Sequence, residues 1–267
     1  RGLYLNWDDI EGRNRFLRRE WDDEERLLDF DEIHKHSKWK NAVKGIFDTQ
    51  RELHRFLVTG SARLDIYKKG QDSLLGRFFT WRLHPLCLSE LKHFFRDSSP
   101  GNLKKLLTLG GFPEPFLEGS ERFAKRWRQE KLRLVFRQDI RDLESVRDIS
   151  ILELFHRALS ERVSGTVVLS NIARDLEIAP KTAKAWLNVL EKTYSVFTVR
   201  PHSKGSSAAI TKAPKVYFYD NGEVLGDDGA RFENLVASHL LKRANYLEDL
   251  TGDAYELRHL RDKHGHE

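Results

Sequence analysis

Two adjacent carboxylates, Asp31 and Glu32, are the residues of this sequence best placed to do chemistry. They follow a short, mostly apolar run at residues 27–30, after which the sequence becomes polar. This is the pattern of a buried parallel strand that delivers acids to its carboxyl end, where open α/β sheets bind their ligands. In a protein that hydrolyses nucleotides, the first acid would hold Mg²⁺ through its water shell, and the second would orient and deprotonate the attacking water. The alternative is a strand that ends in a solvated acidic turn.

The elements around these acids alternate between strand and helix. Trp39, Val43, Ile46 and Phe47 have the i, i+4, i+7, i+8 spacing of an amphipathic helix. Apolar segments typical of strands lie at residues 2–6, 27–30, 56–59 and 78–83. This alternation predicts a parallel sheet with crossover helices.

Several short strings stand in an order that resembles a known family. They are DEIHK at 31–35, WK at 39–40, FLVTGSARL at 56–64, LLGR at 74–77, GGFPE at 110–114, KAPKVYFYD at 212–220 and RFENLVA at 231–237. Together they closely resemble the prokaryotic predicted ATPases of the AAA+ class, which carry a conserved C-terminal region. The resemblance covers essentially the whole chain and implies an α/β parallel-sheet domain of the P-loop type.

The resemblance also implies roles for individual residues. Asp31 and Glu32 would form the Walker B pair, with Asp31 as the Mg²⁺ anchor and Glu32 as the activator of water. Thr59 or Ser61, after the adjoining strand, would sense the γ-phosphate or the attacking water. Arg77 is a candidate for stabilising charge in the transition state. The expected cofactors are therefore ATP and Mg²⁺.

One part of such a site is missing from the sequence. The phosphate cradle, Gly-x-x-x-x-Gly-Lys-Ser/Thr, occurs nowhere in the 267 residues. Family order would put this loop before Arg1, and the chain has no Met, so we expect an AAA+ domain truncated at its N-terminus within a fragment of a longer protein. The alternative is a homologue that has lost nucleotide binding.

The middle of the chain changes to helical patterns. We expect a helical lid over residues 89–148, including a helix that begins after Ser120 and is rich in basic side chains. Those basic residues indicate either a surface for nucleic acid or the solvated face of a lid helix.

Residues 149–204 have the pattern of a winged helix-turn-helix. A short helix over 169–176, with Ser170 as its expected cap, and a three-residue turn lead to a helix begun by Pro180. On that second helix Lys181, Lys184 and Asn188 would face outward, as the residues of a recognition helix do. Contact with duplex DNA and contact with a protein partner both remain open.

The C-terminal part, residues 205–267, resembles the start of an α/β restriction-endonuclease-like module. The strand Asp and the Glu-x-Lys of such nucleases are not present, so Glu233 is interpreted as a surface helix residue rather than a metal ligand. Residues 1–88 would form the partial ATPase core, and the lid, winged helix and C-terminal module complete a four-part division.

Composition limits the class of protein only broadly. The net charge of +5 is too mild to require nucleic acid, and one cysteine, Cys87, excludes an internal disulfide framework and fits a cytoplasmic protein. Neither a stretch long enough to span a membrane nor a signal peptide is evident. Scattered histidines show no spacing for zinc.

Two functional classes follow from the sequence. In the first, an ATPase switch couples nucleotide hydrolysis to a winged helix and a C-terminal module that contact DNA or a protein. In the second, a degenerate ATPase scaffold carries a DNA-binding or protein-interaction module without hydrolysis. The partner, the cellular process and the oligomeric state do not follow from the sequence.

Overall fold

The computed structural model describes residues 1–60, 74, 76–94, 100–136, 149–202 and 213–260. The chain divides into two compact units, Arg1–Thr80 and Trp81–Glu267. Each unit has its own hydrophobic core, and each is described separately below.

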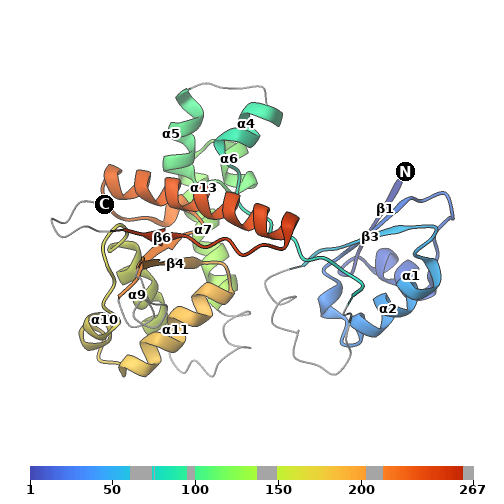
Figure 1. Ribbon diagram of the computed structural model, residues 1–267, viewed down its shortest axis with the longest axis horizontal. Helices are drawn as coiled ribbons and strands as arrows, with labels where there is room; N and C mark the ends of the chain where they lie inside the picture. Colours follow the sequence, from blue (N-terminus) through green and yellow to red (C-terminus); the bar gives the residue numbers. More distant parts are fainter. Residues whose placement is uncertain (61–73, 75, 95–99, 137–148, 203–212, 261–267) are drawn as a thin grey trace. The chain divides into compact units, whose positions relative to one another are not determined.

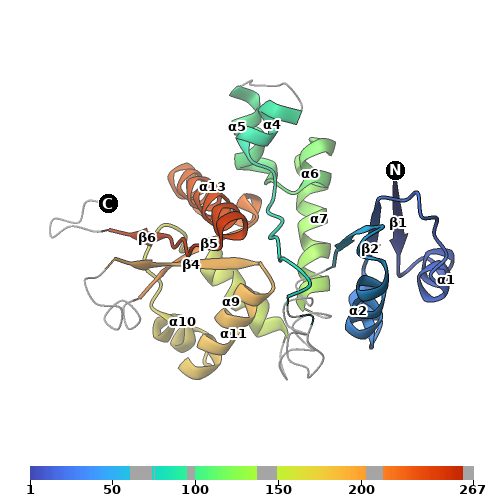
Figure 2. The same cartoon turned by 45° about the vertical axis from the view of Figure 1, so that its right-hand side comes forward.

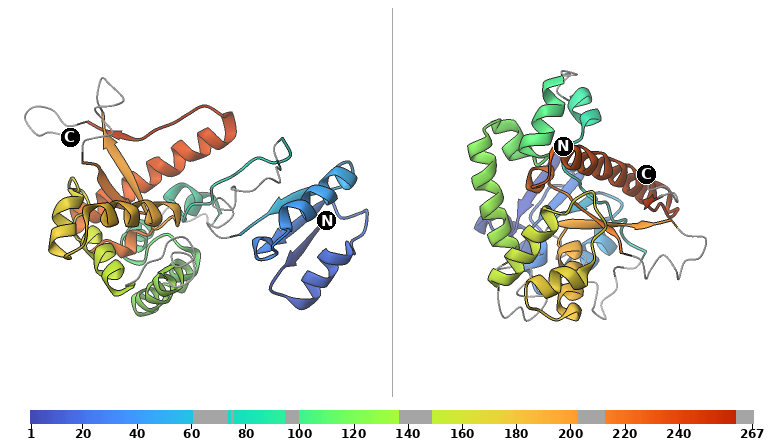
Figure 3. Two further views of the ribbon diagram at one scale, coloured as in Figure 1. Left: turned by 90° about the horizontal axis from the view of Figure 1, so that it is seen from below. Right: turned by 90° about the vertical axis from the view of Figure 1, so that its left-hand side faces the viewer.

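The first unit is built on a parallel sheet. Its elements are β1 (Gly2–Asn6), α1 (Ile10–Arg18), β2 (Leu27–Asp31), the 3₁₀ turn η1 (Ile33–Lys35), α2 (Trp39–Gln50) and β3 (Arg55–Val58). The strands pair in the order β1-β2-β3, all parallel, as the alternation of strand and helix predicts. This unit is the blue part of the chain in Figure 3.

One face of this sheet carries the core. Leu28 and Phe30 of β2 are buried against Phe16 of α1 and against Val43 and Ile46 of α2. The opposite face is open: on the three neighbouring strands, Tyr4, Leu27 and Leu57 remain 58%, 40% and 45% exposed. The strand β2 therefore buries the side chains on its face toward α1 and α2, whereas the sequence predicts a buried strand without distinguishing its faces.

The expected strand at residues 78–83 does not form. The segment lies at the boundary between the two units and has no regular secondary structure. Phe79 and Leu83 are almost fully exposed, and the backbone N of Arg82 donates a hydrogen bond to Asp249 Oδ2 at 3.0 Å. Side-chain contacts of Arg82 to Asp249, rather than a strand ladder, hold this end of the segment.

The second unit begins with four helices: α4 (Leu88–Phe94), α5 (Pro100–Leu109), α6 (Pro113–Glu118) and α7 (Glu121–Leu134). Ser120 caps α7, since its Oγ accepts a hydrogen bond from the backbone N of Phe123 at 3.3 Å. Figures 1 and 2 show α4, α5 and α6 grouped together on one side of the long helix α13 (Asp228–Thr251).

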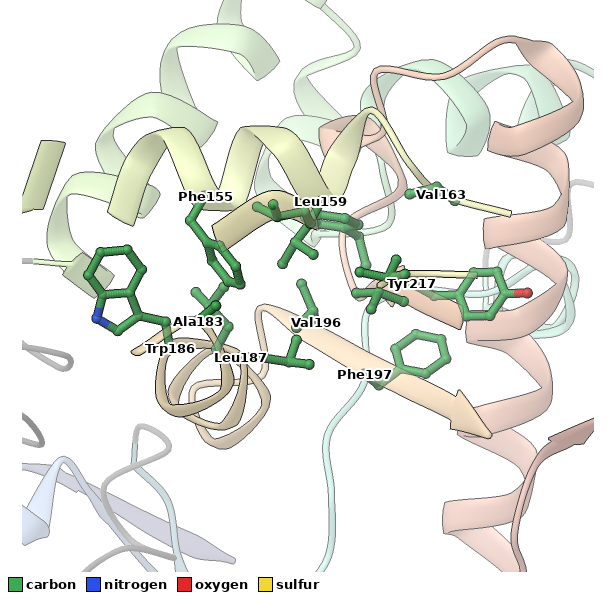
Figure 4. Packing of buried hydrophobic residues seen from close by; sticks show 14 of the residues in the cluster. Phe155, Leu159, Val163, Ala183, Trp186, Leu187, Val196, Phe197 and Tyr217 are labelled. Atoms are coloured by element: carbon green, nitrogen blue, oxygen red, sulfur yellow. The ribbon is translucent and has the colours of Figure 1, made fainter. Parts of the chain in front are cut away.

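Three further helices and a hairpin share one core in this unit. They are α9 (Ile149–Ser160), α10 (Leu169–Asp175), α11 (Pro180–Lys192), β4 (Val196–Pro201) and β5 (Lys215–Phe218). Figure 4 shows Phe155 and Leu159 of α9 pointing toward Ala183 and Leu187 of α11 and Val196 of β4. Helix α10 begins at Leu169 and lacks a side-chain cap, so the expected capping by Ser170 is wrong.

The sheet of the second unit has the order β5-β4-β6. Strand β4 is antiparallel to β5 and parallel to the short β6 (Arg258–His259). Beyond β5, Thr166 forms a bridge to Lys215, and the backbone N of Val167 donates to Pro214 O at 2.8 Å. The chain segment before α10 thus adds to the sheet beside β5.

The long helix α13 packs against β5 through the side chain of Asn234. The Asn234 amide accepts a hydrogen bond from Phe218 N at 2.7 Å and donates to Phe218 O at 3.0 Å. A second donation, to Asn221 Oδ1 at 3.0 Å, ties it to the 3₁₀ turn η3 (Asn221–Glu223). Asn234 therefore brings the family-like segment at residues 231–237 into contact with the end of β5.

Candidate functional site

Asp31 lies at the carboxyl end of β2 and is held by side chains from both neighbouring strands. Its Oδ1 accepts hydrogen bonds from Thr59 Oγ1 at 2.5 Å and from the backbone N of Glu32 at 3.1 Å. Its Oδ2 accepts hydrogen bonds from Tyr4 Oη at 2.5 Å and from Asn6 Nδ2 at 3.1 Å. Four donors thus surround one carboxylate.

The register of the parallel strands brings these residues together. Asn6 is the partner of Asp31 across β1 and β2, and the backbone N of Thr59 donates to Phe30 O at 3.0 Å. Because parallel strands end at the same edge of a sheet, the polar residues that follow each strand share that edge.

The hydrogen bonds keep Asp31 ionised. Burial alone would raise its pKa, but hydrogen bonds from Thr59, Tyr4 and the Glu32 backbone outweigh it, with help from the charge of Lys35, and lower the pKa below its usual value. Burial raises the pKa of the neighbouring Asp29, and the charge of Asp31 raises it further.

An ionised carboxylate beside a hydroxyl is a donor set that suits Mg²⁺. This cation prefers oxygen ligands and usually keeps several of its waters while one or two carboxylates hold it. Within the residues that the structure describes, no group of three or more His, Cys, Asp or Glu side chains could hold a metal. Asp31 fits the role of a single anchor rather than a member of an all-protein metal cage.

Glu32 follows Asp31 in a left-handed backbone conformation, with φ of 55° and ψ of 19°. Its Oε2 lies 3.1 Å from Lys35 Nζ and 3.8 Å from His34 Nε2, both in the turn η1. Lys35 Nζ also contacts Asp8 Oδ2 at 2.5 Å. The two acids of the pair are therefore held differently, Asp31 by neutral donors and Glu32 by a lysine.

The other predicted residues of this site are not all brought together. Arg77 pairs with Asp48 of α2, Nε to Oδ1 at 2.8 Å and Nη2 to Oδ2 at 3.3 Å. No contact between Arg77 and Asp31 or Glu32 is recorded for the described residues. Ser61 lies outside the described residues.

The predicted outward residues of the second unit lie on α11. Lys181, Lys184 and Asn188 are exposed, while Ala183 and Leu187 on the other face are buried in the core. A row of polar side chains along an exposed helix face can contact a partner without disturbing the packing beneath it.

Glu233, the residue compared with a nuclease ligand, has structural partners. Its Oε1 accepts a hydrogen bond from Tyr217 Oη at 2.6 Å and lies 3.0 Å from Lys215 Nζ. These contacts tie α13 to β5, and no recorded contact joins Glu233 to a second acid among the described residues.

Residues 1–92 match the family model described as an AAA domain. This match supports an AAA-type ATPase domain at the start of the chain. Residues 101–225 match the model of a domain of unknown function, DUF8612. The AAA-type domain thus contains Asp31, Glu32, Thr59 and Arg77, and α11 lies within the second match.

Two curated relatives share part of this sequence. They are the uncharacterized proteins Mb2031c of Mycobacterium bovis and Rv2008c of Mycobacterium tuberculosis, each 24% identical over 168 residues. The matched region covers 63% of this chain and 36% of each relative, so the chain spans about a third of their length. No solved structure is significantly similar to the chain.

Two residues of the AAA-type domain at this edge were missed by sequence reasoning. Tyr4 and Asn6 lie on the first strand, 25 to 27 positions before Asp31. The available signal was the polar Asn6 at the end of an apolar run, in register with Asp31.

None of the helices in the described part of the chain combines the length and apolar character needed to cross a membrane.

Proposed function

We propose that the AAA-type domain binds ATP with Mg²⁺ and takes part in its hydrolysis. One observation carries the proposal: Asp31, which accepts four hydrogen bonds and has a lowered pKa, meets Thr59 at the carboxyl edge of a parallel sheet. In this proposal Asp31 holds the cation, Glu32 activates water and Thr59 contacts the γ-phosphate. Mg²⁺, when bound, would neutralise charge on the phosphates.

The hydrogen bonds at Asp31 bear on how it could hold the cation. All of its acceptor positions are in use, so a cation or its water takes the place of one donor. Tyr4 is the donor most easily released, because its side chain is 58% exposed.

Metal binding to the 267-residue chain tests the first step directly. We expect Mn²⁺, as a paramagnetic substitute for Mg²⁺, to bind with a Kd that Asp31→Asn weakens about tenfold or more. Asp23→Asn, which removes an exposed carboxylate of the same unit, is the matched control and should change nothing. Equal Mn²⁺ binding by the wild type and Asp31→Asn would exclude Asp31 as the anchor.

Turnover tests the second step. Without a phosphate cradle, the 267-residue chain should show no Glu32-dependent release of phosphate from ATP. In a protein that joins this chain to such a loop, Glu32→Gln should bind ATP but turn over slowly, because the amide cannot accept a proton. Wild-type turnover in that variant would favour the alternative, a scaffold that does not hydrolyse nucleotide.

We further propose that α9 to β5 form a winged helix whose recognition helix is α11. The support is the order of elements, with a strand-like segment before α10 pairing with β5, and an exposed polar face on α11. Lys181 and Lys184 would contact DNA phosphates and Asn188 would read a base edge. A protein partner on the same face is the alternative.

Salt dependence distinguishes these partners. For duplex DNA, Lys184→Ala should weaken binding about uniformly across sequences and lower the salt slope by about one unit, whereas Asn188→Ala should relax sequence preference. The measurement is a salt titration of binding to random duplex. Parallel slopes for wild type and Lys184→Ala, or no binding at low salt, would decide against DNA.

A further inference from the structure

A cleft in the second unit lies outside the proposed ATP site and outside the exposed face of α11. It has a volume of about 810 Å³ and is lined mainly by one face of α7 and one face of α9, with η3 at its end. Small-molecule sites in proteins usually measure about 300–1,000 Å³. All but one of its lining residues fall within the match to the domain of unknown function.

The cleft contains a buried guanidinium. Arg128 of α7 is only 8% exposed and lines the cleft, and its Nη1 donates a hydrogen bond to Leu109 O at 3.0 Å. No carboxylate of the described residues lies within ion-pair distance of it. The side chain passes so close to Gly222 that a Cβ there would lie 2.1 Å from Nη1. The lack of a side chain at Gly222 thus leaves room for the buried guanidinium of Arg128.

Two acids of this region, Glu223 and Asp220, already have other side-chain partners. Glu223 Oε1 lies 2.5 Å from Lys131 Nζ, and Glu223 Oε2 lies 3.0 Å from His156 Nε2. Asp220 Oδ2 lies 3.6 Å from the same Lys131 Nζ. Two members of this paired network, His156 and Glu223, line the cleft together with Arg128.

The walls of the cleft add positive charge. Five lining side chains are basic and three are acidic, and one of those acids is Glu223 of the paired network. Two of the basic side chains, Arg133 and Arg157, form ion pairs with the neighbouring Glu130 and Glu161. Lys125 and Arg157 are exposed on the two helices, and Arg231 approaches from the start of α13. Apolar side chains, among them Leu132 and Phe136, line the same space. Such a mixed surface suits a molecule with an anionic group and an apolar body.

We propose that this cleft binds a phosphorylated small molecule, with its phosphate at Arg128 and Lys125. Arginine presents several donors in a fixed plane that matches phosphate oxygens, and a partly buried site strengthens the attraction. The apolar walls contact the rest of the ligand. This site is independent of the proposed hydrolysis of ATP, because it uses no residue of the AAA-type domain.

Pyrophosphate is the probe that tests the charge recognition. Calorimetric titration of the 267-residue chain at low salt should give saturable binding. Arg128→Met should weaken it about tenfold or more, because a hydrogen bond between charged groups is lost from a buried position. Lys125→Gln, at an exposed site, should weaken it about two- to fivefold without affecting folding.

Two control variants locate the effect. Lys104→Gln removes an exposed lysine of the same unit that does not line the cleft, and should bind pyrophosphate like the wild type. Asp31→Asn should also bind it unchanged, which separates this cleft from the AAA-type domain. Absence of binding, or binding that Lys125→Gln leaves intact, would overturn the proposal. A short single-stranded DNA that binds through Lys125 where pyrophosphate does not would also overturn it, in favour of nucleic acid.

Discussion

Strands β2 and β5 are each followed closely by two carboxylates, Asp31 and Glu32 in the first unit and Asp220 and Glu223 in the second. Asp31 lies at an accessible edge among neutral donors. Asp220 and Glu223 are buried, 1% and 8% exposed, and lie against Lys131 and His156.

The acids after β2 and after β5 have the same position relative to a strand. Their different surroundings show that the partners of a carboxylate decide whether it can bind a cation or only stabilise the fold. Neutral donors hold a carboxylate ionised while leaving its charge uncompensated, so it can still attract a cation. A buried lysine compensates the charge in place, and the carboxylate then serves the packing of the unit.

Removing the buried cation should have the largest effect. Lys131→Met leaves Asp220 and Glu223 without their lysine, and we expect a loss of about 3–5 kcal/mol in the free energy of unfolding, measured with urea. Lys125→Met, at an exposed site on the same helix, should change it by no more than about 0.5 kcal/mol. If the two variants were equally stable, Lys131 would not be needed by Asp220 and Glu223, and the proposed difference between these acids and Asp31 would be wrong.

Acid should reveal the same network through Glu223. Burial alone would raise its pKa, but Lys131 and His156 lower it from 4.5 to about 2. Because the pKa is lower in the folded state, the stability from Glu223 is fully present above about pH 4.5 and is lost as pH falls toward 2.

The variant Glu223→Gln isolates this contribution. The difference in stability between wild type and Glu223→Gln should be about 3 kcal/mol near neutral pH and should shrink below pH 4.5. Burial raises the pKa of the neighbouring Asp220, and the charge of Glu223 adds to that rise, so the pKa of Asp220 should fall in Glu223→Gln. A difference that did not vary with pH between 2 and 5 would contradict the assignment.

The smallest effect is expected at Asp31. Replacing Thr59 with Val, or Tyr4 with Phe, removes one donor and should raise the pKa of Asp31, as followed by the carboxyl carbon signal in NMR titration. The Thr59 variant should show the larger rise, because its hydrogen bond lowers the pKa more. An unchanged pKa in both would mean that neutral donors do not keep this acid ionised.

Local patterns in the sequence predicted a good part of this fold. The spacing of apolar residues placed the helix at Trp39 and the buried face of α11 correctly, since each depends only on one element and its own core. The segment 78–83 failed because alternation alone cannot exclude an irregular segment at a boundary between units. The cap of α10 failed because Val168, not Ser170, precedes its first turn.

Residues far apart in the sequence limited the prediction of the site. Thr59 was expected in the site from the family resemblance, as a sensor after the adjoining strand, whereas Tyr4 needed the register of β1. The basic residues of α7 were expected on a solvated face or a nucleic-acid surface. Arg128 and Lys131 instead lie inward, because acids about 90 positions later, Asp220 and Glu223, pack against that helix.

The amide of Asn234 has a consequence for how β5 meets other chains. By pairing with both the N–H and the C=O of Phe218, one side chain imitates the backbone of an adjacent strand. Exposed strand edges invite pairing with foreign strands and hence aggregation. At this end of β5 the N–H and the C=O of Phe218 are already paired with Asn234. Helix α13 therefore blocks the hydrogen bonds that another strand would need in order to pair with β5 at this position.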